Sequence, residues 1–168
     1  MRGEKSVAAI VVAAGSGERA ALGAASEPKQ YRRLAGVPVL SRTIAALLVL
    51  DSVDWVLPVI RQGHEARYAA LGLQHDKLLA PVIGGADRQA SVRAGLDALA
   101  SLAPDDVLIQ DAARPFLDGA LVSGVLAGLA DHDGAVPVIP VTDTIKRSRD
   151  GRNLDGTEDR HTLFAAQT

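Results

Sequence analysis

The stretch VAAIVVAAGSGER, residues 7–19, decides how this chain folds. Residues 7–14 are apolar at every position, and glycines at 15 and 17 then break the run. A short run of this kind, ended by glycine, is typical of a parallel strand that is buried on both faces. A glycine-rich turn at the end of such a strand, followed by Arg19, is suited to holding a polyphosphate. We therefore expect a buried strand that ends in a phosphate-binding turn.

Strands and helices are expected to alternate along the rest of the chain up to residue 139. The strand-like runs are residues 55–60, 78–83, 107–110 and 135–139, and the runs with helical spacing are 39–50, 65–73, 87–102 and 118–129. This alternation indicates an α/β fold with a mainly parallel sheet, right-handed crossovers and flanking helices. In such sheets ligands bind beyond the carboxyl ends of the strands. Three candidate site segments, residues 14–19, 84–91 and 111–114, are therefore expected to converge.

The character of the sequence changes after residue 140. Residues 141–147 and 160–164 favour β structure, and they flank a polar, glycine-bearing loop over 148–159. We expect them to form a projecting, hairpin-like β-arm over about residues 141–164. The last four residues, 165–168, follow with no closing helix or strand, which is typical of a truncated chain.

The composition excludes several classes of protein. A length of 168 residues favours a single domain over residues 1–168. With 48% hydrophobic residues and a formal net charge of −2, the chain is neither disordered nor built to bind nucleic acid through bulk charge. The absence of cysteine excludes disulfides and thiolate metal sites. The short apolar runs predict neither a signal peptide nor a membrane span, so we expect a cytoplasmic protein.

Two familiar phosphate-binding motifs fit the opening stretch poorly. Residues 15–20 match the dinucleotide-binding fingerprint in its variant that ends in alanine. That fingerprint expects an acidic residue about 20 positions further on, at the end of the second strand. Residues 36–39 and the strand end near Arg61 supply none. A P-loop is excluded because no Gly-Lys-Ser/Thr triplet closes the turn.

Arg19 and Lys29 are the candidate phosphate-binding cations. A nucleoside triphosphate carries about four negative charges, and attack at its α-phosphorus gathers more charge on the equatorial oxygens and the leaving pyrophosphate. Fixed cations stabilise such a transition state more than the ground state. Either residue alone is as easily a solvated surface cation. The pair beside a glycine turn favours a phosphate site.

Residues 84–91 form a second candidate segment. Gly84 and Gly85 let the backbone approach a planar base closely, and a helix is expected to begin directly afterwards. Asp87 and Ser91 also have simpler explanations, as a helix N-cap and an ordinary helix residue.

A third candidate segment follows the strand-like run that ends at Gln110. Asp111 can support Mg²⁺ or a ribose hydroxyl, and Ala112 leaves room for the sugar. The alternative is that Asp111 and Arg114 form an ion pair that only holds the turn.

Taken together, these segments resemble the 2-C-methyl-D-erythritol 4-phosphate cytidylyltransferases of the non-mevalonate isoprenoid pathway. The matching pieces occur in the family's order: residues 13–19 (AAGSGER), 28–31 (PKQY), 84–92 (GGADRQASV), 110–115 (QDAARP), 143–146 (DTIK) and 166–168 (AQT). The resemblance implies a Rossmann-like nucleotidyltransferase fold. It also implies a homodimer in which the arm is exchanged between subunits.

The resemblance further implies a reaction and a set of roles. The family transfers the cytidylyl group of CTP to a sugar-alcohol phosphate, with Mg²⁺ as the divalent cation, and releases pyrophosphate. By position, Arg19 and Lys29 are the catalytic cations. The implied CTP-binding residues are Ala14, Gly15, Ser16, Gly17, Gly84, Gly85, Asp87, Ser91, Asp111 and Ala112, with Asp111 also on the metal side. The implied substrate-binding residues are Arg114, Thr144, Arg160 and Thr168, and those on the arm would reach a partner's site.

Two departures from the family pattern matter. Residues 24–27 lengthen the gap between Arg19 and Lys29, as in the version that is fused to a cyclase of the same pathway. A fused or associated cyclase domain is therefore a candidate partner. The family also continues by several tens of residues past Thr168, where it carries a substrate-positioning lysine. The resemblance thus implies a C-terminally truncated chain with impaired catalysis.

Two other functions stay open at this point. One is a sugar-phosphate nucleotidyltransferase of the same architecture that uses a different base. The other is a non-catalytic nucleotide-binding module that works through its arm as an assembly surface. The presence of both Arg19 and Lys29 argues against the second.

Overall fold

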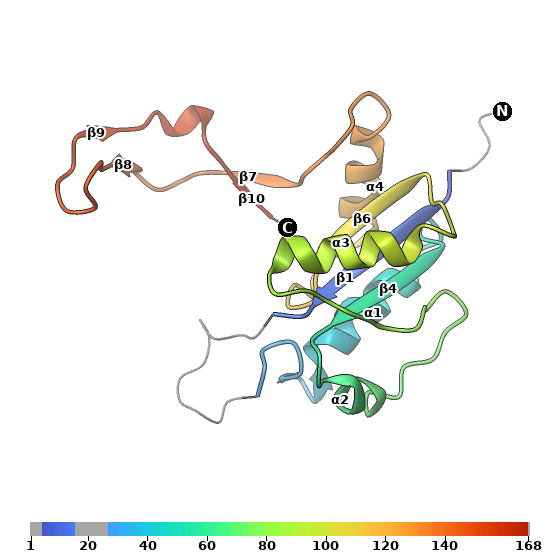
Figure 1. Ribbon diagram of the computed structural model, residues 1–168. Coiled ribbons are helices and arrows are strands. Elements are labelled where there is room, and N and C mark those ends of the chain that lie inside the picture. The colour runs from blue at the N-terminus through green and yellow to red at the C-terminus, as the bar shows by residue number, and fades with distance from the viewer. Residues whose placement is uncertain (1–4, 16–26, 168) are drawn as a thin grey trace. The chain divides into compact units, whose positions relative to one another are not determined.

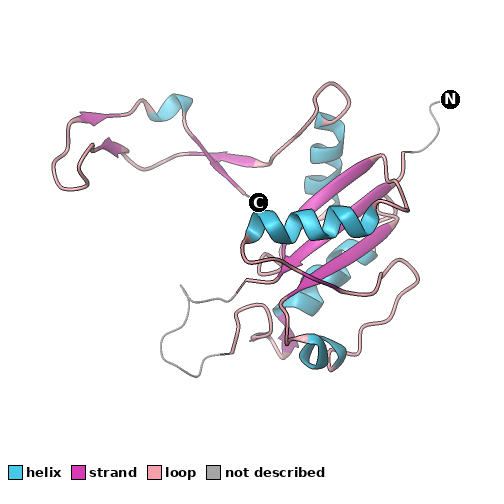
Figure 2. Ribbon diagram, viewed as in Figure 1, coloured by secondary structure: helices cyan, strands magenta, loops and turns pink. Residues whose placement is uncertain are grey.

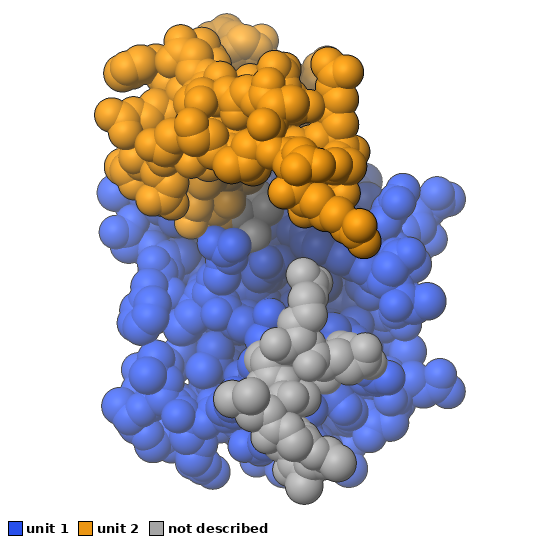
Figure 3. Space-filling view, turned by 90° about the vertical axis from the view of Figure 1, so that its left-hand side faces the viewer, with its two compact units in different colours: residues 1–123 blue, residues 124–168 orange. Residues whose placement is uncertain are grey.

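A computed structural model describes residues 5–15 and 27–167 of the chain (Figures 1 and 2). The chain divides into two compact units, residues 1–123 and 124–168, which Figure 3 colours separately. The first unit holds the parallel sheet, and the second holds the segment expected to form the arm. That both belong to one functional domain over 1–168 stays a prediction.

The first unit is built on a four-stranded parallel sheet in the order β5-β4-β1-β6. Its strands are β1 (Val7–Ala13), β4 (Trp55–Ile60), β5 (Val82–Ile83) and β6 (Asp106–Asp111). The apolar run at 7–14 thus forms the buried inner strand that was predicted, with β4 and β6 on either side. In register, Ala13 lies beside Ile60 and Val12 beside Asp111, so three strands end at the same edge.

Two helices cover opposite faces of this sheet, as Figure 1 shows. Helix α1 (Val39–Leu48) buries Leu40, Ile44 and Leu47. Helix α3 (Arg88–Leu99) buries Leu99 among side chains of β1 and β4. Gly95 lets α3 approach closely, because a Cβ there would lie 2.9 Å from Ile10 Cδ1. The mainly parallel α/β fold with flanking helices is therefore confirmed.

The remaining helices agree with the predicted runs except at their ends. Helix α2 (Glu65–Ala69) is shorter than the run predicted over 65–73, and α4 (Gly119–Gly128) lies inside the predicted 118–129. Asp87 is the N-cap of α3, since its side chain accepts a hydrogen bond from the amide of Ala90.

The strand predicted over residues 78–83 is mostly wrong. Only β5 forms, together with an isolated bridge between Leu78 and Val56. Proline is the physical reason. The amide of Val56 donates to Lys77 O, on the side of β4 that faces β5, and two residues later Pro58 has no amide hydrogen to donate. Pro81, on the facing segment, likewise cannot donate. The ladder resumes at Val59, opposite Val82.

A short hairpin went unpredicted between the Lys29 segment and α1. Strands β2 (Arg33–Leu34) and β3 (Val37–Pro38) pair antiparallel around Ala35 and Gly36. These two turn residues have φ of 48° and 80°, the positive values that a tight hairpin of this handedness requires. The hairpin leads the chain directly into the first turn of α1.

The second unit contains two short antiparallel ribbons. Strand β7 (Val138–Pro140) pairs with β10 (Phe164–Ala166), and β8 (Lys146–Arg147) pairs with β9 (Gly156–Thr157). Hairpin pairing in this segment is confirmed, but its expected strand positions are largely wrong. Part of the expected loop is β9, and residues 160–162 form the 3-10 helix η2 (Arg160–Thr162) instead of a strand. Asp159 caps η2 by accepting from the amide of His161, which favours a turn there.

Candidate functional site

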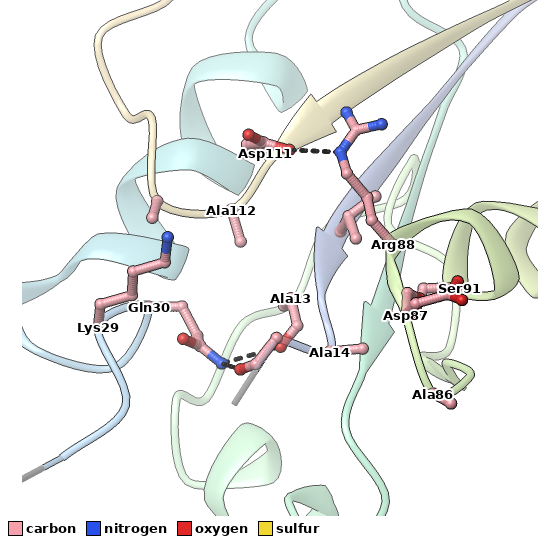
Figure 4. A pocket seen from close by; sticks show the side chains of 13 residues that line it. Ala13, Ala14, Lys29, Gln30, Ala86, Asp87, Arg88, Ser91, Asp111 and Ala112 are labelled. Atoms are coloured by element: carbon pink, nitrogen blue, oxygen red, sulfur yellow. Dashed lines mark hydrogen bonds and ion pairs between the residues drawn. The ribbon is translucent and has the colours of Figure 1, made fainter. Parts of the chain in front are cut away.

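A pocket of about 290 Å³ lies beyond the carboxyl ends of β1 and β6 and beside the start of α3 (Figure 4). Its lining comes from all three predicted site segments and from the Lys29 segment. The lining residues are Val12, Ala13, Ala14, Gly15, Lys29, Gln30, Ala86, Asp87, Arg88, Ser91, Asp111, Ala112 and Ala113. The predicted convergence is therefore confirmed.

The two glycines after β5 form the close-packed back of this pocket. A Cβ on Gly84 would lie 2.6 Å from Ala14 Cβ and 2.7 Å from Ser91 Oγ, while one on Gly85 would clash with Ala90. The amide of Gly84 donates to Ile60 O at 2.8 Å and so anchors the segment to the end of β4. Glycine is thus required here for space. Gly84 lies next to Ala14 and Gly85 next to Ala90, and neither glycine is among the residues that line the pocket.

Asp87 and Ser91 line the pocket and also stabilise the start of α3. The Asp87 carboxylate accepts from the amide of Ala90 at 2.7 Å. The Ser91 hydroxyl, which is only 1% exposed, donates to Asp87 O at 2.7 Å. The simpler structural explanations of both residues therefore hold, and their contact with a base stays a prediction.

Asp111 lies between two arginines at the end of β6. Arg88 Nε is 3.2 Å from Asp111 Oδ1, and Arg114 Nε is 3.6 Å from Asp111 Oδ2. The predicted ion pair with Arg114 therefore exists, and Gln110 Nε2 further holds the turn by donating to Arg114 O at 2.9 Å. Two guanidinium groups around one carboxylate leave a local excess of positive charge, which favours an anionic ligand.

Arg88 is a pocket residue that sequence reasoning did not select. It stands inside the quoted motif of residues 84–92, directly after the N-cap Asp87, and Figure 4 shows its side chain reaching to Asp111. A basic residue at the first position of a helix is unusual, because the helix dipole favours acidic residues there. This conflict between a basic first residue and the helix dipole is the sequence signal that could have identified Arg88 as a site residue.

Lys29 and Gln30 line the opposite wall of the pocket. Lys29 is exposed, and Figure 4 shows its side chain extending toward the turn after β6. Gln30 is only 2% exposed, and its Nε2 donates to Ala13 O at 2.9 Å and to Gly15 O at 3.1 Å. Gln30 lies within the motif at residues 28–31, but the sequence predicts no role for it.

Tyr31 anchors the same segment to α2. Its ring makes a T-shaped contact with His64 at 5.4 Å between centroids, and the Arg67 guanidinium lies 5.4 Å from the ring centroid. Burial raises the pKa of Tyr31 and lowers the pKa of His64, because the charged form of each is penalised away from water. Burial likewise raises the pKa of the neighbouring Tyr68 to about 12.

Several predicted site residues are not brought to this pocket by the described structure. Ser16, Gly17, Arg19 and Thr168 lie outside the described residues. Thr144 and Arg160 belong to the second unit, where Arg160 Nη1 donates to Thr142 O at 3.0 Å. Their roles stay predictions.

The described residues contain no group of three or more His, Cys, Asp or Glu side chains that could hold a metal ion by themselves. Asp111 is the carboxylate that lines the pocket at the end of β6. In the part of the chain that the structure describes, no helix is long and apolar enough to cross a membrane.

Comparison with known proteins agrees with this architecture. A family model for IspD, 2-C-methyl-D-erythritol 4-phosphate cytidylyltransferase, matches residues 7–168. The chain belongs to this family. The family is one of nucleotidyltransferases, so the resemblance noted from the sequence is confirmed.

Curated relatives of this cytidylyltransferase family include two bifunctional IspD/IspF enzymes. That of Rhodospirillum rubrum is 46% identical over 162 residues, which is 96% of this chain and 41% of the relative. That of Paramagnetospirillum magneticum is 49% identical over 161 residues, which is 95% of this chain and 40% of the relative. The chain thus spans about two fifths of the length of these relatives.

Solved structures of the family share the fold. The 4-diphosphocytidyl-2C-methyl-D-erythritol synthase of Anaerococcus prevotii superimposes with a TM-score of 0.79 at 24% identity, covering 99% of this chain and 70% of that one. The 2-C-methyl-D-erythritol 4-phosphate cytidylyltransferase of Thermus thermophilus gives a TM-score of 0.63 at 30% identity, covering 99% of this chain and 68% of that one. The Rossmann-like nucleotidyltransferase fold is therefore confirmed.

Proposed function

We propose that the pocket at the strand ends binds CTP and that the protein transfers the cytidylyl group to 2-C-methyl-D-erythritol 4-phosphate, releasing pyrophosphate. The observation that carries this proposal is the meeting of the residue 13–15 turn, Lys29, the start of α3 and the end of β6 around one pocket. Membership of the cytidylyltransferase family supports the choice of base and acceptor.

The base and ribose belong to the side of the pocket lined by Ala14 and the start of α3. Gly84 packs so closely against Ala14 and Ser91, and Gly85 against Ala90, that no larger side chain fits at either position, which keeps bulky groups away from a flat ring at this wall. Ser91 and Asp87 supply polar atoms at the start of α3. Asp111 and Ala112 would face the ribose at the end of β6.

The triphosphate would lie between the cations of two facing pocket walls. Lys29, Arg88 and Gly15 line the pocket, and Gly15 is followed in the sequence by Ser16, Gly17 and, two positions later, Arg19. Lys29 and Arg19 would stabilise the charge that develops on the α-phosphoryl oxygens and the leaving pyrophosphate. Arg88 adds a third cation on the opposite wall.

Mg²⁺ is the proposed divalent cofactor, with Asp111 as its protein ligand. Magnesium in nucleotide enzymes is commonly held by one or two carboxylates together with substrate phosphates, so a single carboxylate fits. Asp111 lines the pocket and keeps about a third of its side-chain surface exposed, 32%. When bound, the ion would neutralise charge on the triphosphate.

The reaction requires no covalent enzyme intermediate. The acceptor phosphate is already an anion at neutral pH, so its oxygen can attack the α-phosphorus in line while the bond from that phosphorus to pyrophosphate breaks. The protein's task is to hold the acceptor phosphate and the α-phosphate at the attack distance and to screen their repulsion.

The acceptor and assembly parts of the proposal concern other residues. Arg114, Thr144, Arg160 and Thr168 are the proposed acceptor-binding groups. The arm over 141–164 would join two subunits of a homodimer and carry Thr144 and Arg160 into the partner's site. A fused or associated cyclase domain, supported by the bifunctional relatives, and a cytoplasmic location complete the proposal.

Pyrophosphate release tests the proposed reaction. The protein is offered each of the four nucleoside triphosphates with Mg²⁺ and either methylerythritol phosphate or a hexose phosphate, and nucleotide binding is measured in parallel. We expect release to require CTP and methylerythritol phosphate together. Faster release with a hexose phosphate and another nucleotide would instead indicate a sugar-phosphate nucleotidyltransferase. Tight CTP binding with no release from any pair, also in a chain extended by the family's C-terminal segment, would indicate a binding module.

A further inference from the structure

Buried polar side chains hold the walls of the pocket from behind. Among the described residues, the buried polar side chains are Gln30, Ser41, Thr43 and Ser91. Three of them donate to main-chain carbonyls of the pocket segments: Gln30 to residues 13 and 15, Thr43 to Ala112 O at 2.8 Å, and Ser91 to Asp87 O at 2.7 Å. Each pocket wall therefore has its own buried support.

Gln30 differs from the other two because it supports the phosphate side. Its amide nitrogen carries two N–H groups, and these reach Ala13 O at 2.9 Å and Gly15 O at 3.1 Å. Ala13 and Gly15 both line the pocket, and a carbonyl oxygen of either residue that turned toward a phosphate would repel it. The two N–H groups of Gln30 bind the carbonyl oxygens of Ala13 and Gly15 and so offset their partial negative charge.

Gln30 is itself held rigidly. The main-chain carbonyl of Gln30 accepts from the amide of Leu40, in the first turn of α1, at 2.8 Å. The turn around Lys29 is closed by the amide of Tyr31, which donates to Pro28 O at 2.9 Å. Because Lys29 directly precedes Gln30, the two side-chain hydrogen bonds tie the segment that carries this cation to the turn after β1. The distance between the two phosphate-binding elements is thereby set.

We propose that Gln30 is a positioning residue that aligns Lys29 and the turn after β1 on the triphosphate of the nucleotide. The inference rests on the proposed function, because it takes the bound anion to be the β- and γ-phosphates of CTP. It assigns Gln30 no contact with the nucleotide. Substitution of Gln30 must therefore weaken the binding of the β- and γ-phosphates and leave the binding of the base and ribose unchanged.

The ratio of CTP to CMP affinity separates this role from general support of the fold. Gln30→Met keeps a side chain of similar length without donors, and Thr43→Val is the matched control, since it removes a buried donor to the ribose-side carbonyl of Ala112. Dissociation constants for CTP and CMP are measured by calorimetry, and folding of each variant is checked by urea unfolding.

We expect Gln30→Met to weaken CTP about tenfold while CMP changes by less than about twofold, since both carbonyls lose the hydrogen bond that Gln30 donates to them. Thr43→Val should change both constants by the same factor. Equal weakening of CTP and CMP by Gln30→Met, or no weakening, would overturn the positioning role. A wild-type protein that binds CTP no more tightly than CMP would contradict the proposed function itself.

A second variant keeps the inference testable if Gln30→Met does not fold. Gln30→Glu places a carboxylate against two carbonyl oxygens near pH 8. Burial and these oxygens should raise the pKa of the new carboxyl above its ordinary value of about 4.3, so that protonation near pH 5 restores one donor. Relative to wild type at the same pH, the preference for CTP over CMP should fall at the higher pH and recover in part at the lower one. A preference that does not depend on pH, relative to wild type, would contradict the proposal.

Discussion

Arg88 Nε donates to Asp111 Oδ1 at 3.2 Å across 23 positions of sequence, and this contact joins the start of α3 to the end of β6. Arg114 approaches the other oxygen of the same carboxylate at 3.6 Å. The group proposed to hold Mg²⁺ is thus already paired with two cations. Metal binding and arginine pairing must therefore compete at Asp111, and release of Arg88 would free a cation for the triphosphate.

Asp111→Asn is expected to abolish the effect of Mg²⁺ on CTP binding. The amide keeps the shape of the side chain but removes the charge that attracts the metal. The midpoint of thermal unfolding should change little, because these ion pairs are partly exposed and screened by solvent. Calorimetric titration of CTP with and without Mg²⁺ checks this. A variant that keeps the wild-type response to Mg²⁺ would remove Asp111 from the metal site.

Gly84→Ala is expected to destabilise the fold and weaken CTP binding. The new Cβ would lie 2.6 Å from Ala14 Cβ and 2.7 Å from Ser91 Oγ, so the pocket wall must shift. Overpacking of this kind costs about 1–3 kcal/mol of unfolding free energy. Urea unfolding measures this quantity.

Gly124→Ala is the matched control for that substitution. Gly124 lies within α4, and a Cβ there would meet nothing within 4 Å. Alanine should therefore be neutral or stabilise the helix by up to about 1 kcal/mol. Similar losses of stability in both variants would show that space at Gly84 is not the reason for its glycine.

Lys29→Ala is expected to lower the rate of pyrophosphate release by about a hundredfold or more, since a fixed charge acts on the transition state more than on the ground state. Arg93→Ala is the control, because it removes one positive charge from an exposed i,i+4 pair with Asp97 and does not line the pocket. Steady-state rates with saturating CTP compare the two. Equal rates for Lys29→Ala and Arg93→Ala would count against the catalytic role.

Stability is expected to fall as the pH drops below about 6.5, through His64. Burial, aided by the charges of Arg67 and Arg61 and opposed by Glu65, lowers the pKa of this histidine from its ordinary value of 6.5. The unfolded chain therefore binds a proton at a pH where the folded chain does not, and the unfolding free energy decreases with falling pH. Well above 6.5 the histidine is neutral in both states and this contribution is flat.

Urea unfolding of wild type and His64→Phe between about pH 5 and 8 isolates this contribution. Phenylalanine keeps an aromatic contact with Tyr31 but does not titrate. The variant should show a shallower decline of unfolding free energy below pH 6.5 than wild type. Parallel curves for the two proteins would exclude His64 as the source.

The sheet and its helices were predictable where local patterns decide the structure. Val7–Ala13 is apolar throughout, and α3 begins at an aspartate whose side chain caps it. The strand predicted over 78–83 shrinks to β5, and its own residues give only part of the reason: Pro81 lies within the run, whereas Pro58 lies on the neighbouring strand. The ribbons of the second unit were located imprecisely because strands of two or three residues are too short to show a periodic pattern.

The segments that line the pocket were predictable from the sequence, but the long-range hydrogen bonds and ion pairs that hold them together were not. Alternating strands and helices imply that strand ends converge, and the three predicted segments do meet. Gln30 and Arg88 were missed because their roles depend on partners distant in sequence. Gln30 bonds to carbonyls 15 and 17 positions away, and no local pattern marks a glutamine for burial.

Mapping of CTP binding onto the backbone tests the central claim most directly. Isotope-labelled protein is titrated with CTP in the presence of Mg²⁺, and amide chemical shifts are followed by NMR. The account predicts that the largest changes fall at residues 13–15, 84–91 and 111–113, and that ATP at the same concentration produces much smaller ones. Changes centred elsewhere, or equal changes with ATP, would contradict the assignment of this pocket to CTP.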